Sequence, residues 1–450
     1  MKAKLCLHGV DVKHQAQLLG LVKKELRAFS VAYKVKERYF DSNDMYKCRV
    51  ARFTPKQEEG WLRVCCVWGV LLVSDKPVNV ADIVFEYESG TEAENRVAAM
   101  VTSILQGKLH FVLDEPDLSR RIALVRGSYF LDKLHHYDES TAMTALRCHL
   151  PWHLYVINKL WEQLLLSGGG QRQLWRQLRV KLRRLRSVLS LVKPLFPESA
   201  RWQRSLKELA AALSAVREYD VLLQTCARLR VSQQSGVRAT LPVQQQGAGP
   251  CELVQSTLLA PPEAVPNLQH LLAGLRQQAQ ARALEQLKLR DITLELAQMY
   301  IALYSFANRP CNIGLRDFFA ERLGKWAGKL QALPQVHPDL QDMEQLHQVR
   351  IKLKRFRYGL QSVPEVGASP QLLRSLKYLQ DLLGVVHDDY VNEQYLVQLV
   401  AAHPELPELR YEVAMLRGYE QARADVAMEQ LTNQWQDFAR LLSEWMEGLE

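Results

Sequence analysis

The sequence predicts an α+β domain at the amino terminus, followed by an all-α region that contains a repeated pair of helices. Over the first 140 residues, strand-like alternation of apolar and polar positions is mixed with helical periodicity. From residue 142 onward, nearly every segment follows the 3.6-residue period of an amphipathic helix. Within this helical part, a basic segment that begins at Arg176 recurs with the same pattern from His347.

The elements expected in the α+β domain alternate between strand and helix. Residues 2–8 and 30–40 are predicted as strands, with an amphipathic helix over 12–29 between them. The further elements, in order, are strands at 61–74 and 83–87, a helix at 92–106, and strands at 109–113 and 121–130.

Two breaks divide the helical region. Ser167-Gly-Gly-Gly170 is a flexible turn between helices, and residues 231–266 are rich in Gln, Gly, Pro and Ser, as in a linker. Helices are expected at 267–308, 314–332, 340–362, 370–383 and 385–402, and after Pro407. The predicted division is residues 1–140, 141–230, 231–266 and 267–450.

Composition favours a cytoplasmic globular protein. The chain has 450 residues and a net charge of +9, and its start lacks the apolar core of a secretory signal. Its most apolar stretch, Trp61 to Val73, is too short to cross a bilayer and contains Arg63. Eight cysteines without framework spacing indicate reduced thiols. We therefore expect no membrane partner.

The positive charge is concentrated in the two copies of the basic segment. Residues 172–186 hold seven Lys or Arg and no acid. Each copy also has apolar residues at i, i+4, i+7 and i+11, which predicts a core-facing stripe: Leu178, Leu182, Leu185 and Leu189, answered by Val349, Leu353, Phe356 and Leu360. Cations at i and i+4 repel one another on a helix, so we expect a polyanion to compensate.

The repeat continues in the next helix of each half, where Arg204 and Lys207 answer to Arg374 and Lys377. Solvated helix faces normally mix both signs of charge, and these do not, which favours anion binding. Arginine pairs with phosphate oxygens through two N–H groups at once. The candidate anion-binding residues are Arg176, Arg179, Lys181, Arg183, Arg184, Arg186, Arg204, Lys207, His347, Arg350, Lys352, Lys354, Arg355, Arg357, Arg374 and Lys377.

Residues 145–450 resemble the CHAD domain, the conserved histidine α-helical domain. The resemblance rests on His347-x-x-Arg350-x-x-x-Lys354-Arg355-x-Arg357-Tyr358, on Leu383-Gly384-Val-Val-His387-Asp388, and on matching segments from Arg179 and Arg217. It implies two helical bundles related by a pseudo-twofold axis, which bind inorganic polyphosphate through a basic central groove. The first half departs from the family at Arg176, which replaces the histidine, and at Leu213-Ser214. Arginine keeps the charge and the donors.

The amino-terminal domain more weakly resembles a CYTH-type domain, a β-tunnel whose family binds or hydrolyses triphosphates. Arg38-Tyr39-Phe40-Asp41 matches that family's Tyr-Phe-Asp segment. Where the family has Glu-x-Glu-x-Lys on its first strand, this chain has Lys2 and Lys4, so a metal-assisted triphosphatase lacks its ligands. An unrelated α+β module is the other interpretation.

No catalytic motif of the nucleotide-binding, serine-hydrolase or zinc-protease kinds occurs in the sequence. We therefore expect a polyphosphate-binding module, suited to recruitment to polyphosphate granules, with no catalytic residues, metal or cofactor. The alternatives are a phosphoanhydride hydrolase whose helical part holds the polymer, and a protein that binds nucleic acid or another phosphate-rich polyanion.

Two histidines have competing interpretations. His347 suits either a phosphate donor or a histidine at the bundle's edge; a metal site is disfavoured because Ile351 occupies i+4. For His387-Asp388-Asp389, the prediction is a helix amino terminus whose carboxylates complement the dipole and order neighbouring arginines. A metal or acid–base cluster is the less favoured alternative.

Overall fold

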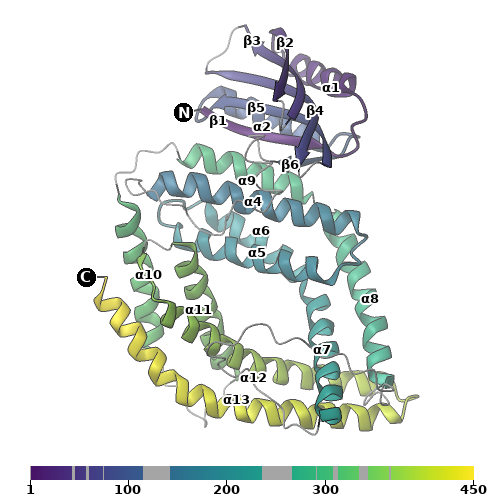
Figure 1. The fold of residues 1–450 in the computed structure, drawn as a ribbon, viewed down its shortest axis with the longest axis vertical. Coiled ribbons are helices and arrows are strands. Elements are labelled where there is room, and N and C mark those ends of the chain that lie inside the picture. Colours follow the sequence, from purple (N-terminus) through teal and green to yellow (C-terminus); the bar gives the residue numbers. More distant parts are fainter. Residues whose placement is uncertain are drawn as a thin grey trace. The chain divides into compact units, whose positions relative to one another are not determined.

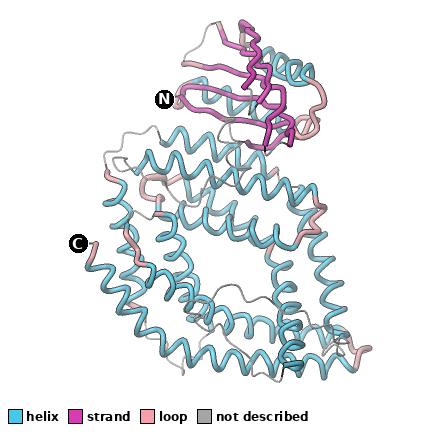
Figure 2. Tube along the Cα trace, viewed as in Figure 1, coloured by secondary structure: helices cyan, strands magenta, loops and turns pink. Residues whose placement is uncertain are grey.

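The structure is a computed structural model, and its fold has a sheet at the amino terminus followed by helices (Figures 1 and 2). The predicted class, α+β followed by all-α, is confirmed. The described residues are 2–42, 46–56, 60–73, 76–114, 142–235, 266–289, 291–307, 313–333, 343–363 and 366–449. Among them, no helix is both long and apolar enough to span a membrane.

The sheet has six strands in the order β2-β3-β4-β5-β1-β6, and all neighbours are antiparallel. Its strands are β1 (Lys2–Gly9), β2 (Tyr33–Ser42), β3 (Tyr46–Pro55), β4 (Leu62–Val73), β5 (Lys76–Glu88) and β6 (Phe111–Asp114). Helices α1 (Gln15–Ala28) and α2 (Glu92–Leu105) pack against it. Leu5, Leu7 and Phe85 are completely buried, and Cys6 between the two leucines is buried in a cluster on the opposite face of β1.

Sequence periodicity located five of these strands and missed β3. Four of the ten residues of β3 are polar or basic side chains that alternate irregularly with apolar ones, so its pattern is weak. The predicted strand at 121–130 lies outside the described residues.

Packing divides the chain into two compact units, Met1–Ala210 with Leu284–Phe319, and Ala211–Ala283 with Ala320–Glu450. The first unit joins the sheet to α4 (Ala142–Leu166), α5 (Arg172–Leu191), most of α6 (Ser199–Ala212) and α9 (Ile292–Ala307). Asn158 of α4 donates to the carbonyl oxygen of Leu113 at 3.1 Å, and the Tyr300 hydroxyl of α9 donates to that of Lys4 at 2.7 Å. These bonds attach the helices to strands β6 and β1.

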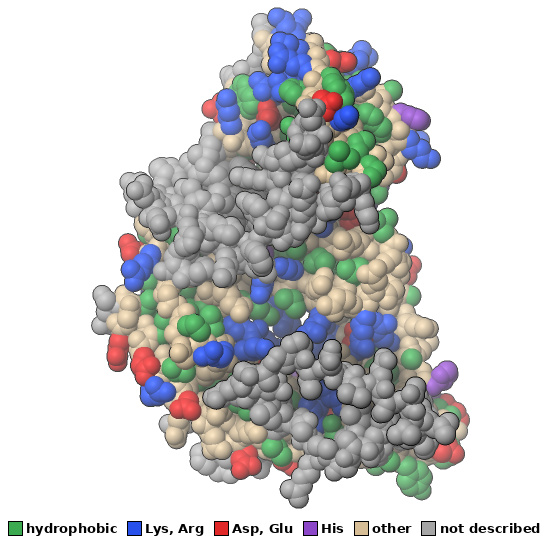
Figure 3. Space-filling view, in the orientation of Figure 1, with side chains coloured by type: hydrophobic (Ala, Val, Ile, Leu, Met, Phe, Trp, Pro, Cys, Tyr) green, Lys and Arg blue, Asp and Glu red, His purple; other side chains and the backbone are tan. Residues whose placement is uncertain are grey.

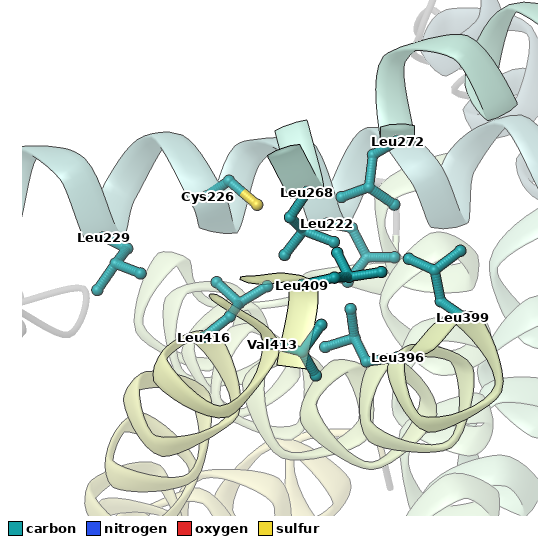
Figure 4. Close-up of a cluster of buried hydrophobic side chains, with 10 residues drawn as sticks. All are labelled: Leu222, Cys226, Leu229, Leu268, Leu272, Leu396, Leu399, Leu409, Val413 and Leu416. Atoms are coloured by element: carbon teal, nitrogen blue, oxygen red, sulfur yellow. The ribbon is translucent and has the colours of Figure 1, made fainter. Parts of the chain in front are cut away.

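The second unit consists of α7 (Ser214–Ser235), most of α8 (Pro266–Leu289) and α10 (Leu315–Gln331), α11 (Met343–Ser362), α12 (Pro370–Ala402) and α13 (Glu408–Glu447). Helices α7, α8, α12 and α13 share a core of buried leucines around Cys226 (Figure 4). Burying this apolar surface fixes α7 against the α12–α13 hairpin.

Two predicted helix boundaries were wrong. The helix expected over 267–308 is two helices, because the Asp291 carboxylate accepts a hydrogen bond from the Leu294 amide at 2.9 Å and starts a new helix. Conversely, the two helices expected on either side of Gly384 are one continuous helix, α12. A glycine inside a helix costs about 1 kcal/mol relative to alanine and does not have to end it.

Candidate anion-binding faces

Helix α5 carries the first copy of the basic segment. It follows the predicted turn, where Gly168 and Gly169 adopt positive φ angles and the Trp175 indole donates to the Gly169 carbonyl oxygen at 2.7 Å. All four predicted apolar positions, Leu178 to Leu189, are buried. This buried stripe fixes the rotation of α5 and therefore the direction of its cations.

We call Arg176, Arg179, Arg183 and Arg186 the first basic face. At about 100° per residue they fall within roughly 40° of a common direction, beside the buried stripe. Arg176 is exposed and the other three are half-buried. Burial and the neighbouring Arg183 lower the pKa of the Arg186 guanidinium, and the Nε of Arg186 is buried without a hydrogen-bond partner among the described residues. Such a donor is suited to an anion.

The other candidates of the first half do not share this face. Lys181 lies about 180° around α5 from it and Arg184 about 120°, by the same geometry. On α6, Arg204 and Lys207 are exposed, three residues apart. Helix α6 starts where the Ser199 hydroxyl donates to the Leu189 carbonyl oxygen of α5 at 3.3 Å.

Helix α11 carries the second copy. Its apolar positions, from Val349 to Leu360, are again buried. His347, Arg350, Lys354 and Arg357 form the second basic face, at the helical angles of their counterparts on α5. The Nε of Arg357 is buried without a hydrogen-bond partner among the described residues, like the matching Nε of Arg186.

Two candidates on α11 point away from this face. Lys352 is exposed on the far side of the helix. The Arg355 guanidinium lies over the Trp326 ring of α10, 4.1 Å from its centroid. Burial and the nearby Arg322 lower the pKa of Arg355.

Helix α12 contacts α11, and the Gln380 side chain donates to the Leu353 carbonyl oxygen at 2.9 Å. Its residues Arg374 and Lys377, both candidate anion-binding residues, are exposed. One helical turn beyond Lys377 lies Asp381, whose carboxyl experiences the charges of Lys377, Arg357 and Lys354. Burial raises the pKa of Asp381 despite these cations. An acid therefore lies among the cations of this half.

The structure brings His347 to a second histidine. The rings of His347 and His387 have centroids 4.6 Å apart and are tilted by 31°. Burial, His387 and Arg350 together lower the pKa of His347. His387 thus lies beside the second basic face, and a bound anion there would favour the protonated form of His347.

Sequence reasoning did not include Arg217 among the candidate residues, and it did not show which arginines Asp388 orders. The Asp388 carboxylate accepts a hydrogen bond from Arg217 Nη2 of α7 at 2.8 Å and lies 3.7 Å from Arg350 Nη2. The predicted ordering of arginines by this acidic segment is confirmed, but the predicted helix amino terminus was wrong, since His387 and Asp388 lie in the interior of α12. Burial tends to raise the pKa of Asp388, but His387, Arg217 and Arg350 lower it to about 2.

The sheet shows how Lys4 is neutralised. Lys4 Nζ lies 2.9 Å from the Glu86 carboxylate, which also accepts a hydrogen bond from Arg63 Nη1 at 3.1 Å. His8 pairs with the buried Asp82 at 2.8 Å. In the part of the chain that the structure describes, no three His, Cys, Asp or Glu side chains are grouped as a metal site would require.

Charge is unevenly spread over the visible surface (Figure 3). Lys and Arg side chains gather over parts of the helical region and over the sheet, where acids lie among them. Clustering of this kind raises the local concentration of anions.

The sequence model of the CHAD domain matches residues 159–397, from within α4 to within α12, and so includes both basic faces. This chain belongs to the CHAD domain family. The sheet and α13 lie outside the matched CHAD residues.

A solved CHAD domain structure agrees with this chain at the level of the fold. The CHAD domain from the plant Ricinus communis is 21% identical with a TM-score of 0.51, over 68% of this chain and 92% of that one. PptA from Streptomyces chartreusis is 17% identical with a TM-score of 0.46, over 66% of this chain and 100% of that one. None of the curated proteins compared matches the sequence.

Proposed function

We propose that this CHAD protein binds inorganic polyphosphate through its two basic faces. The observation that carries the proposal is the duplicated row of cations beside a buried stripe, with the buried, unbonded Nε of Arg186 matched by that of Arg357. Membership of the CHAD family supports the choice of polyphosphate over other anions.

The chemistry of each face suits a linear phosphate polymer. Successive cations at i+3 and i+4 are spaced along the helix by about 4.5–6 Å, from a rise of 1.5 Å per residue. Phosphate oxygens repeat along the whole polymer, so no single register is required. Guanidinium groups such as those of Arg183 and Arg357 bind two such oxygens at once, while Lys354 adds a mobile point charge.

The match between the two rows in the sequence suggests that both contact one polymer. A tethered second contact acts at high effective concentration and can multiply affinity by about a hundredfold or more. Disabling either row, through Arg179→Ala/Arg183→Ala or Arg350→Ala/Lys354→Ala, should then weaken binding of long polyphosphate far more than twofold. Two independent sites, each keeping full affinity when the other is disabled, would refute this.

Binding rather than hydrolysis is proposed because the first strand carries Lys2 and Lys4 where the triphosphatase family has metal-binding acids. Cations at these positions repel the divalent metal that a triphosphatase would need.

A competition titration tests the function. Labelled long-chain polyphosphate, bound to the full chain, is displaced by unlabelled polyphosphate, single-stranded DNA or RNA at several salt concentrations. We expect polyphosphate to compete best, because the basic faces lack the interleaved aromatic side chains that stack bases. If either nucleic acid competes better, that nucleic acid and not polyphosphate is the preferred ligand. An affinity that does not depend on salt concentration would refute ionic binding altogether.

A further inference from the structure

Helix α7 brings one arginine of the first sequence half to the second basic face. Arg217 Nη2 donates to Asp388 Oδ1 at 2.8 Å, and Arg350 Nη2 lies 3.7 Å from the same oxygen. The two guanidinium groups come from α7 and α11, and the carboxylate comes from α12. All three helices belong to the second compact unit.

The packing of α7 against α12 and α13 fixes the position of the Arg217 backbone. Leu222 and Cys226, farther along α7, are buried against leucines of α12 and α13 (Figure 4). The Tyr395 hydroxyl of α12 donates to the Tyr219 hydroxyl at 2.6 Å, and their rings meet edge to face with centroids 5.5 Å apart. The backbone that carries Arg217 is therefore anchored within two residues of it.

Arg350 of α11 lies against α12 beside Gly384. A Cβ atom built at Gly384 would lie 3.9 Å from Arg350 Nη2, an ordinary van der Waals distance. The Arg350 guanidinium therefore contacts the surface of α12 at this position. One turn later, Asp388 lies near both arginines.

The charges in this cluster do not cancel. One carboxylate faces two guanidinium groups, and His387 and His347 stand next to it. Asp388 bonds one N–H of Arg217, and the other N–H groups of that side chain have no hydrogen-bond partner among the described residues. The Arg217 side chain is 26% exposed, so these donors can meet a ligand.

We propose that Arg217 is a further contact for the phosphate polymer and that Asp388 is the residue that positions it. The second basic face then draws its cations from three helices, α7, α11 and α12. This inference rests on the proposed function. An arginine already held at one end loses less side-chain freedom when it binds an anion, which raises affinity.

The rival interpretation is an ion pair that only ties α7 to α12. Under that interpretation, loss of Arg217 lowers stability and leaves the salt dependence of binding unchanged. Under ours, each lost phosphate contact reduces the slope of log affinity against log salt by about 0.7, as for single strands.

The experiment measures polyphosphate affinity across salt for Arg217→Ala, Arg217→Lys and Arg440→Ala in the full chain, with urea unfolding of each. Arg440 is the matched control, an exposed arginine of α13 in the same unit that pairs with Glu444 at 2.6 Å. We expect Arg217→Ala to weaken binding by about tenfold with a reduced slope, since bonds to charged groups are the strong ones. Arg217→Lys should recover part of the affinity and the full slope.

The outcomes separate this inference from the proposed function. If the unaltered chain does not bind polyphosphate, both fail. If it binds and Arg217→Ala binds equally well with an unchanged slope, only the contact role of Arg217 fails. If Arg440→Ala weakens binding as much as Arg217→Ala, the effect is one of net charge, and the contact is refuted.

A double-mutant cycle tests the role of Asp388. Once Asp388→Asn has removed the charge that orients Arg217, the further change Arg217→Ala should cost about threefold or less. An equal cost of Arg217→Ala in both backgrounds would show that Asp388 does not position this arginine.

Discussion

The salt dependence of polyphosphate binding should follow the number of cations on the second half. Besides Arg217, five cationic side chains of this half lie on two contacting helices, namely Arg350, Lys354, Arg357, Arg374 and Lys377. At about 0.7 of a slope unit per neutralised phosphate, five contacts give a slope near −3.5. A rise from roughly 50 to 200 mM salt would then cost these contacts about a hundredfold in affinity.

The perturbation is Lys354→Gln/Arg357→Gln, which removes two charges while keeping long side chains over α12. The slope should fall by about 1.4, and the same rise in salt should weaken the remaining contacts only about twentyfold. Fluorescence anisotropy with labelled polyphosphate at four or more salt concentrations measures both slopes.

The control is Arg417→Gln/Arg440→Gln on α13. Both arginines are exposed, and they pair with Glu393 and Glu444 respectively. This variant changes the net charge by the same amount and should leave the slope as it was. Equal slopes for the unaltered chain and Lys354→Gln/Arg357→Gln would refute direct contact by these residues, and equal losses in both variants would reduce the effect to net charge.

Three further predictions concern single groups, and a fourth concerns hydrolysis by the full chain. Binding should strengthen as pH falls from about 7.5 to 5.5, because phosphate favours protonated His347, whose pKa in the free protein is lowered by burial, His387 and Arg350; His347→Gln should flatten the pH profile of affinity. Asp381→Asn should tighten binding at pH 7 by about fivefold, since unit charges a few ångström apart repel by roughly 1 kcal/mol even in water, and weaker binding in titrations would overturn its role as a competing charge. Burial raises the pKa of Glu420 to about 7, so its contribution to stability is complete below its unfolded pKa of about 4.5 and is lost as pH rises through 7; urea unfolding at pH 8 should find Glu420→Gln more stable by on the order of 3 kcal/mol, and no difference from the unaltered chain would contradict this pKa. Finally, the full chain should release no phosphate from tripolyphosphate with magnesium or manganese, and metal-dependent release would restore the hydrolase interpretation.

The basic faces could be predicted from the sequence because a helix repeats its geometry at every residue. Once Leu178, Leu182 and Leu185 are assigned to the core, the directions of Arg179, Arg183 and Arg186 follow without any tertiary information. The same local rule separates Lys181 and Arg184 from the face. The list of candidates treated all basic residues of the segment as equivalent, although helical periodicity alone could have excluded Lys181 and Arg184 from the face.

The errors arose where contacts with other helices or strands, not the local sequence pattern, decided the structure. Gly384 was interpreted as a break, yet it lies inside α12, at the place where the Arg350 guanidinium of α11 contacts this helix. The strand β3 has a weak apolar pattern but pairs with β2 and β4 along most of its length. Backbone pairing with neighbours already in place can hold a strand whose own periodicity would not predict it.

Arg217 was beyond the reach of any local rule. Its partner Asp388 lies 171 residues away in sequence, and only the buried core shared by α7, α12 and α13 brings the two together. Residue spacing within one helix can reveal a row of cations. It cannot show which acid of another helix pairs with them.

Those acids explain how a basic face can fold before its ligand arrives. Cations at i and i+4 destabilise a helix, and Arg350 on α11 is only 7% exposed, so water does little to screen its charge. Asp388, held ionised by its neighbours with a pKa of about 2, offsets that charge in the free protein. One carboxylate between Arg217 and Arg350 leaves a positive excess, so the pair is stabilised without being neutralised. The same acid that lets the arginines be packed together thus leaves them able to attract a polyanion, which is why its removal should uncouple Arg217 from binding rather than simply strengthen it.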